Sequence, residues 1–161
     1  MPHAAPNPDD STADADADAA QRLAEAVRDA MWQHDSASQA LGLCIQSIAP
    51  GRAVVQMVVR ADMLNGHQTC HGGIIATLAD SCFAFACNSR NALTVAAGFS
   101  IDLLAPARLG DLLTAVGTEL HQAGRTGVYD VDVRNQRGQR IAAFRGRSHA
   151  LHGRQVLAVP D

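Results

Sequence analysis

The chain has 161 residues, of which 47% are hydrophobic and 18% are charged, and its formal net charge is −3. These values suit a single globular domain with a short extension and leave too little sequence for two domains. The sequence contains no lysine, which excludes Schiff-base catalysis and a Walker-type phosphate-binding lysine.

The negative charge is concentrated at the N-terminus. Five aspartates lie within residues 1–18, a segment rich in alanine, aspartate and proline. Because this segment has too few apolar residues to offset the entropy cost of ordering, we expect residues 1–18 to form a disordered tail and residues 19–155 to form a single domain. Residues 19–161 contain 13 arginines and 11 acidic residues. That mildly basic balance gives no reason to expect a nucleic acid as the main ligand, but it suits a small phosphorylated one.

Cysteine usage indicates the cellular compartment. The four cysteines (Cys44, Cys70, Cys82 and Cys87) form no CxxC pair, and the N-terminus lacks the basic start and apolar core of a secretory signal. We therefore expect reduced thiols and a cytoplasmic protein. No apolar run reaches the roughly 18 residues of a membrane span, so we expect no membrane association.

A helix and a hairpin are expected before residue 60. The apolar residues of 19–34 recur at helical spacing, which predicts a short amphipathic helix that covers one end of the core. They are Leu23, Ala26, Val27, Ala30 and Met31. Residues 52–59 alternate in polarity, which predicts a strand, and Pro50-Gly51 supplies the turn from an earlier strand. The residues on its apolar face are Ala53, Val55, Met57 and Val59.

Residues 72–89 predict a buried helix, because they lack proline, are rich in Ala, Leu and Ile, and are apolar around the helix circumference. A single carboxylate, Asp80, lies within this apolar segment. An ionised Asp is costly to bury unless something uses it, so we expect a raised pKa and a functional site. Its neighbours three, four and seven positions away are mostly small, so a ligand or second chain can approach closely. They are Gly73, Ala76, Thr77, Phe83, Ala84 and Cys87.

The remaining chain alternates with period two over residues 95–103, 112–122, 129–133 and 139–150, which predicts four strands. The first of these places Val95, Ala97, Phe99, Ile101 and Leu103 on one face. Turn-rich segments separate the last three strands, so these form an antiparallel meander. One long apolar helix fits against the concave face of a curled antiparallel sheet, which makes the fold class α+β. Phe83, Phe85 and Phe99 are predicted core residues.

The start of the central helix is suited to polarising a carbonyl group. Gly72 and Gly73 have no side chains, so a ligand can reach free backbone N–H groups where the helix dipole favours negative charge, as in an oxyanion hole. Asp80 lies eight residues downstream, which at 1.5 Å per residue is roughly 12 Å away. One carbonyl cannot touch both groups. If both act on one substrate, they come from two subunits of a two-fold homodimer with antiparallel helices.

Several motifs resemble, in order and spacing, those of the PaaI-type hotdog-fold acyl-CoA thioesterases. The resemblance covers residues 40–150. The motifs are Asn65-Gly66-His67, Cys70-His71-Gly72-Gly73, Leu78-Ala79-Asp80, Asn88-Ser89 and Phe144-Arg145-Gly146-Arg147-Ser148-His149. The glycine pair with an acid eight residues later is much more specific than a lone glycine motif. The resemblance implies a hotdog fold, in which a curled antiparallel sheet wraps around one long central helix.

The resemblance also implies an activity, namely hydrolysis of acyl-CoA thioesters, notably ring-hydroxylated phenylacetyl-CoA in phenylacetate degradation. It further implies a homodimer that pairs into a homotetramer and uses no metal or redox cofactor. By position, Asp80 matches the catalytic carboxylate, and Gly72 matches the residue whose N–H polarises the thioester carbonyl. Asn65 and His71 match the polar residues beside it. Asp80 either attacks the thioester directly, giving a mixed anhydride, or activates a water molecule.

Further candidates support this site. Gly73 adds a second small residue at the helix start, and Thr77 lies one turn before Asp80 and could hydrogen-bond its carboxylate, although threonine at that spacing more often bonds the backbone. Alternation places Arg145 and Arg147 on one strand face, as contacts for coenzyme A phosphates or as part of a solvated face.

Competing interpretations stay open. His67 and His71 have a spacing that could bind zinc, but no second ligand pair follows. Cys70 and His71 are a poor nucleophile and base, since adjacent side chains diverge. The alternative to an enzyme is a non-catalytic acyl-CoA-binding or regulatory module on the same fold. A dehydratase would need a His and acid pair for proton abstraction, and no convincing pair is present.

Overall fold

A computed structural model describes residues 8–157 of the chain. Within this range the elements are α1 (Pro8–His34), α2 (Ser36–Ala40), β1 (Cys44–Ala49), β2 (Arg52–Val58), the 3-10 helix η1 (Ala61–Met63), α3 (Gly72–Asn88), β3 (Ala92–Leu103), β4 (Leu112–Ala123), β5 (Thr126–Asn135) and β6 (Arg140–Gln155). The predicted order of hairpin, central helix and four strands is confirmed. Among the described residues, no helix combines the length and the hydropathy that a membrane span requires.

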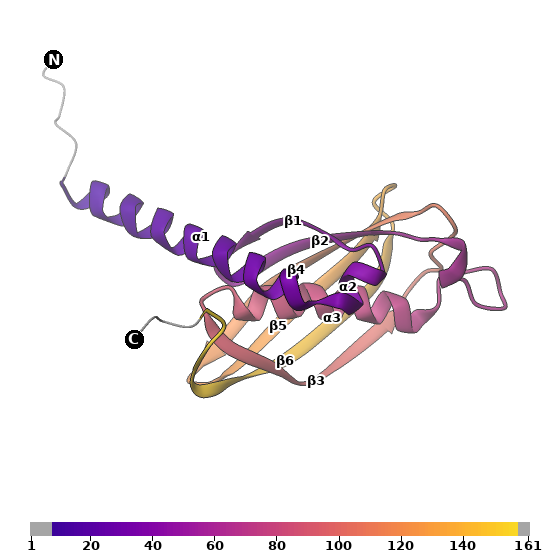
Figure 1. The fold of residues 1–161 in the computed structure, drawn as a ribbon. Helices are drawn as coiled ribbons and strands as arrows, with labels where there is room; N and C mark the ends of the chain where they lie inside the picture. The colour runs from indigo at the N-terminus through magenta and orange to yellow at the C-terminus, as the bar shows by residue number, and fades with distance from the viewer. Residues whose placement is uncertain (1–7, 158–161) are drawn as a thin grey trace, which may run out of the picture.

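The six strands form one antiparallel sheet in the order β1-β2-β4-β5-β6-β3. The sheet curls around α3, which lies along its concave side (Figure 1). This is the predicted α+β hotdog fold, and the predicted meander of the last three strands is confirmed. Strand β3 follows α3 in sequence but pairs with β6, so that it forms the sheet edge opposite β1.

The core lies between α3 and the concave face of the sheet. The predicted apolar face of β2 is fully buried there. The ring of Phe83 packs 5.5 Å from that of Tyr129 and 5.9 Å from that of Phe144, measured between centroids. A Cβ atom on Gly146 would lie only 2.9 Å from the Phe83 ring. The absence of a side chain at Gly146 therefore lets α3 approach the sheet closely.

Helix α1 corrects the prediction for the tail. The helix begins at Pro8, so residues 8–18 are helical where disorder was expected. Alanine is the best helix former and aspartate is favourable near a helix N-terminus, which outweighs the lack of core contacts. Side chains 12–19 are exposed, and α1 projects beyond the sheet (Figure 1). Residues 1–7, the rest of the predicted tail, lie outside the described residues.

The predicted helix at 19–34 is confirmed as the second part of α1, although its inward face is rotated from the predicted one. Ala24 and Val27 are fully buried, whereas Leu23 and Ala26 are exposed. The ring of Trp32 lies 6.5 Å from that of Phe85 on α3. The C-terminal half of α1 is thereby held against the domain.

Strand β3 also differs from the prediction. Its pairing with β6 shifts between Ala96 and Gly98, a bulge that moves Val95 to the opposite sheet face from Phe99 and breaks the single predicted face. The prediction that Phe99 belongs to the core is wrong, because Phe99 is 45% exposed on the edge strand. Its ring still stacks on that of Phe144, with 4.9 Å between the ring centroids. Leu103 is 54% exposed. The β3 edge is therefore an exposed, largely apolar border of the sheet.

Candidate active site

Asp80 lies on the face of α3 that the sheet does not cover. Gly73, Thr77 and Ala84 share this face and are half-buried or exposed, whereas Leu78 and Ala79 are fully buried against the core. Desolvation by partial burial raises the pKa of the Asp80 carboxyl group. Within residues 8–157, no hydrogen bond or ion pair satisfies this carboxylate. An unpaired, partly desolvated carboxylate of this kind can act as a base or nucleophile.

The carboxylate lines a pocket of about 300 Å³ between the second half of α3 and the start of β3. Asn88, at the end of α3, fixes this geometry. Its amide nitrogen donates to the carbonyl oxygens of Ala84 (3.0 Å) and Thr94 (2.9 Å), and its amide oxygen accepts from Thr94 N–H (2.8 Å). The pocket wall formed by β3 is therefore tied to the helix that carries Asp80.

The start of α3 is capped by His71. The ring nitrogen Nδ1 of His71 accepts a hydrogen bond from Gly73 N–H at 3.0 Å. The backbone N–H of His71 donates to the Met63 carbonyl oxygen at 2.8 Å. The intervening Gly72 N–H finds no acceptor in the described part of the chain. Gly72, rather than Gly73, therefore supplies the free donor at the positive end of the helix dipole.

Asn65 organises the loop that leads into this helix start. Its side-chain oxygen accepts hydrogen bonds from His67 N–H (2.9 Å), from Thr69 N–H (3.3 Å) and from the Thr69 hydroxyl (3.2 Å). Asn65 and Gly72 both line a second pocket, of about 290 Å³. Gly72 also lies against Leu103 of β3, since a Cβ at this position would be 2.6 Å from the Leu103 Cδ1 atom.

The structure thus groups the predicted residues into two places. Asn65, His71, Gly72 and Gly73 gather at the start of α3, whereas Asp80 lines a different pocket farther along the same helix. Helix geometry separates Gly72 from Asp80 by roughly 12 Å within one chain. The predicted roles are compatible only if two chains contribute to each site.

Two predicted or alternative roles are not supported by the geometry. The predicted contact from Thr77 to Asp80 is absent, because the Thr77 hydroxyl donates to the Gly73 carbonyl oxygen at 2.9 Å. This is the backbone bond that threonine commonly makes in a helix. Burial raises the pKa of the Cys70 thiol to about 11, and the His71 ring nitrogen Nδ1 is occupied by Gly73 N–H. A Cys70–His71 nucleophile and base pair is therefore disfavoured.

Arg145 and Arg147 lie on the same face of β6, as predicted, on the convex side of the sheet. Arg145 forms a two-pronged ion pair with Asp130, with N–O distances of 2.6 and 2.7 Å. Arg147 forms no ion pair with any residue in 8–157, and its guanidinium lies beside Gly98 at the β3 bulge, where a Cβ would be 3.0 Å away. Of the two arginines, Arg147 is the one free to bind an anion.

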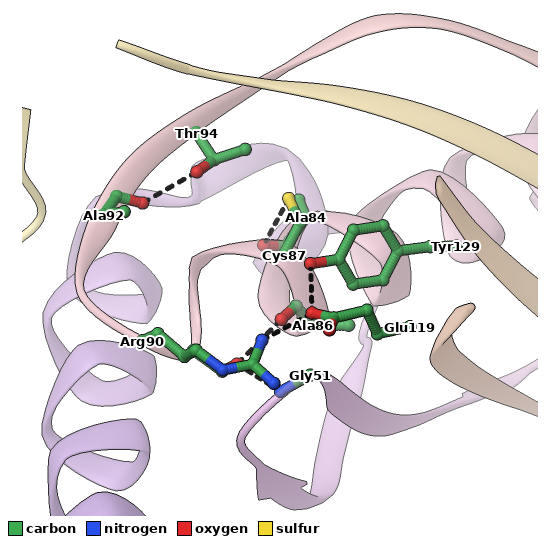
Figure 2. A network of polar contacts seen from close by, with 10 residues as sticks. Gly51, Ala84, Ala86, Cys87, Arg90, Ala92, Thr94, Glu119 and Tyr129 are labelled. Carbon is green, nitrogen blue, oxygen red and sulfur yellow. Dashed lines mark hydrogen bonds and ion pairs between the residues drawn. The ribbon is translucent and has the colours of Figure 1, made fainter. Parts of the chain in front are cut away.

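A polar network at the C-terminal end of α3 was missed by sequence reasoning (Figure 2). The buried Tyr129 hydroxyl donates to Glu119 at 2.8 Å, and Arg90 pairs with the same carboxylate oxygen. Ser89 links the helix end to the β1–β2 turn by accepting from Gly51 N–H at 2.7 Å. The Asn88-Ser89 motif is the sequence signal that marks this helix anchor, although the residues it bonds are distant in sequence.

Comparisons with known proteins identify relatives of this chain in sequence and in fold. Residues 67–142 match the family described as Thioesterase superfamily. The acyl-coenzyme A thioesterase PaaI of Escherichia coli K12 is 49% identical over 124 residues, covering 77% of this chain and 89% of that protein. The structure of E. coli PaaI, from the phenylacetic acid degradation operon, is similar with a TM-score of 0.82 and 46% identity, covering 83% of this chain and 97% of that one.

A more distant solved structure comes from a Streptococcus mutans protein bound to acetyl CoA. It has a TM-score of 0.67 and 30% identity, and the match covers 70% of this chain and 91% of that one. The family match, the identity to PaaI and the shared fold each indicate a thioesterase. The chain therefore belongs to the thioesterase superfamily of hydrolases.

Proposed function

We propose that this protein is an acyl-CoA thioesterase that hydrolyses (hydroxy)phenylacetyl-CoA, or a related aryl acyl-CoA, to the free acid and CoA. The activity rests on the 49% identity to E. coli PaaI, and the aryl substrate rests on that relative's place in a phenylacetic acid degradation operon. The observation that supports it best is the presence of two groups on one helix, Gly72 N–H and the Asp80 carboxylate, that have no hydrogen-bond partner among residues 8–157.

The proposed active site is shared between the subunits of a homodimer. The exposed apolar edge of β3 and the small residues on the uncovered face of α3 are the surfaces available for a second copy. A two-fold axis that sets two α3 helices antiparallel brings Asp80 of one protomer to Gly72 of the partner subunit. Each dimer then has two equivalent sites.

In the proposed reaction, Gly72 N–H donates a hydrogen bond to the thioester oxygen as negative charge develops on it. Asp80 either takes a proton from a water molecule whose oxygen attacks the carbonyl carbon, or attacks that carbon itself to give a mixed anhydride that water then opens. In both routes the C–S bond breaks and CoA leaves as a thiolate that takes up a proton. The raised Asp80 pKa makes the carboxylate a stronger base than an ordinary aspartate.

The ligand's phosphates are assigned to the convex side of the sheet. Arg147 is proposed as a contact for coenzyme A phosphates because it has no ion-pair partner in the described chain, and Arg145 as a weaker one because Asp130 already neutralises it. A homotetramer built from two dimers, and a cytoplasmic location, stay predictions.

A subunit-complementation experiment tests the shared site. Asp80→Asn removes the base while keeping the shape of the side chain. Gly72→Pro removes the N–H but suits the helix start, because proline is favoured at the first helical position and His71 already has the extended backbone that precedes proline. Gly72→Ala is the matched control, because it keeps the N–H and adds the same Cβ as proline, so both variants displace the Leu103 side chain in the same way. CoA release from phenylacetyl-CoA is followed with a thiol-trapping reagent.

We expect each of the two inactivating variants to lose about 100-fold or more in kcat, with Gly72→Ala much more active than Gly72→Pro. After the two inactive variants are unfolded together and refolded as a 1:1 mixture, roughly a quarter of the wild-type rate returns, because half of the dimers are mixed and each of these has one intact site. No recovery on mixing would reject the shared site. Tight acyl-CoA binding by the wild type without CoA release would instead favour the non-catalytic binding module.

A further inference from the structure

Building on the proposed function, we propose that the pocket beside Asp80 is the acyl subsite, and that Met31 of α1 and Val156 beyond β6 determine which acyl groups fit. The pocket of about 300 Å³ is lined by the carboxylate, by α3 and β3 residues such as Phe83 and Thr94, and by these two residues from other parts of the chain. Because Asp80 lines it, a thioester carbonyl at Asp80 would direct its acyl group into this space.

The two residues are held in place by defined contacts. Met31 is half-buried and packs against the core, on the part of α1 that is anchored by the buried Val27. Val156 N–H donates to the Asn91 carbonyl oxygen at 3.2 Å, and Leu157 N–H donates to the Asn91 side-chain oxygen at 2.7 Å. Both residues also lie outside residues 67–142, the segment that matches the thioesterase family. They are therefore fixed pocket walls contributed by the chain's two ends.

The chemistry of the pocket selects uncharged, apolar acyl groups. Asn88 has its amide groups engaged by Ala84 and Thr94 and is not free to bind a substrate. Burial raises the pKa of the Cys87 thiol to about 12, so Cys87 is neutral. No cationic residue lines the pocket among the described residues. An acyl group with its own carboxylate would meet Asp80 without any compensating charge from the same protomer, which disfavours it.

The size of the pocket limits the acyl group further. Met31 and Val156 both line the pocket, so the size of these two side chains limits the acyl group that the pocket holds. Met31 and Val156 are apolar and can change in size without altering the charge of the pocket.

The test compares kcat/KM for acetyl-, phenylacetyl-, decanoyl- and succinyl-CoA. The variants are Met31→Trp, Met31→Ala and Val156→Ala, with Leu23→Ala as a control on the same helix but outside the pocket. We expect Met31→Trp to lower kcat/KM for phenylacetyl-CoA, relative to that for acetyl-CoA, by about tenfold or more. The two alanine variants should raise kcat/KM for decanoyl-CoA, relative to that for phenylacetyl-CoA, by a similar factor. Leu23→Ala leaves both ratios unchanged, and succinyl-CoA is the poorest substrate throughout.

The outcomes separate this inference from the proposed function. A wild-type protein that releases CoA from none of the four substrates overturns the proposed function. A wild-type protein that is active, combined with alanine variants whose substrate ratios match those of Leu23→Ala, overturns only the assignment of the acyl subsite. Because the two alanine variants remove atoms rather than add them, they decide the matter even if Met31→Trp does not fold, as judged by its thermal unfolding.

Discussion

The Nδ1 atom of His71 accepts a hydrogen bond from Gly73 N–H at 3.0 Å, which leaves Gly72 N–H as the free donor at the start of α3. His71→Ala removes this cap, and we expect a loss of about 1 kcal/mol in the free energy of unfolding. His71→Asn restores a side-chain acceptor at the cap and should recover most of that stability. Urea unfolding of the two variants and the wild type measures the difference. Equal stability of His71→Ala and the wild type would contradict the capping role.

The pKa of Asp80 predicts the pH dependence of the reaction. Both proposed routes need the carboxylate ionised, and burial raises its pKa. The acidic limb of kcat/KM should therefore have its midpoint above the value of about 3.9 that is usual for aspartate. Rates measured between pH 3 and pH 8 locate the midpoint, and the residual rate of Asp80→Asn should lack this limb. A midpoint at or below the usual aspartate value would argue against Asp80 as the reacting group.

The same pKa predicts that Asp80 destabilises the fold at neutral pH. Because the folded protein holds this proton more tightly than the unfolded chain, the contribution of Asp80 to stability falls as pH rises from the unfolded pKa through the folded pKa. Asp80→Asn should therefore be more stable than the wild type at pH 7, and this advantage should disappear below the unfolded pKa. Thermal unfolding at pH 7 and pH 3.5 checks the sign, and a less stable Asp80→Asn at pH 7 would contradict it.

Arg147 and Arg145 give a matched pair of charge deletions. We expect Arg147→Met to raise KM for acyl-CoA by about tenfold with little change in kcat. A tenfold change in KM corresponds to the loss of about one hydrogen bond to a charged group. Arg145→Met should have a smaller effect, because Asp130 already pairs with this side chain. Repeating the measurement with the 3′-dephospho form of the substrate identifies the phosphate involved. An equal rise in KM for both substitutions would contradict the expectation that the ion pair with Asp130 weakens the binding of CoA phosphates by Arg145.

The close approach of α3 to the sheet predicts sensitivity at Gly146. Gly146→Ala places a Cβ 2.9 Å from the Phe83 ring, and we expect a loss of about 1–3 kcal/mol in the free energy of unfolding from overpacking. Gly66→Ala is the control, because nothing lies within 4 Å of a Cβ built there and its backbone does not have a positive φ. Chemical denaturation measures the free energy of unfolding of both variants. Equal values for Gly146→Ala and Gly66→Ala would show that the sheet relaxes away from the helix and would contradict this prediction.

Periodicity predicted the elements that have one uniformly buried face. Strand β2 alternates without interruption, and α3 is apolar around most of its circumference, so both were located from sequence. Asp80 stood out because a lone carboxylate in such a helix has few structural explanations. The bulge in β3 could not be predicted in this way, because the apolar residues from Val95 to Leu103 fit a regular alternation and the extra residue shows only in the pairing with β6.

The details of the candidate site depend on side-chain choices that sequence leaves open. Thr77 could bond Asp80 or the backbone, and in the structure it bonds the Gly73 carbonyl oxygen. Likewise, which of the two glycine N–H groups stays free depends on where the His71 ring points. The first part of α1 was predicted as disordered because hydrophobic content was weighed above helix propensity, and an alanine-rich segment favours the helix.

The solitary position of the Asp80 carboxylate has a consequence for turnover. In the proposed reaction, cleavage converts a neutral thioester into a carboxylic acid that ionises at neutral pH, in a pocket lined by no cationic residue from the described chain. Once Asp80 regains its negative charge, it repels the newly formed anion next to it. Hydrolysis thus creates the electrostatic force that expels its own product, which keeps accumulated acid from occupying the pocket.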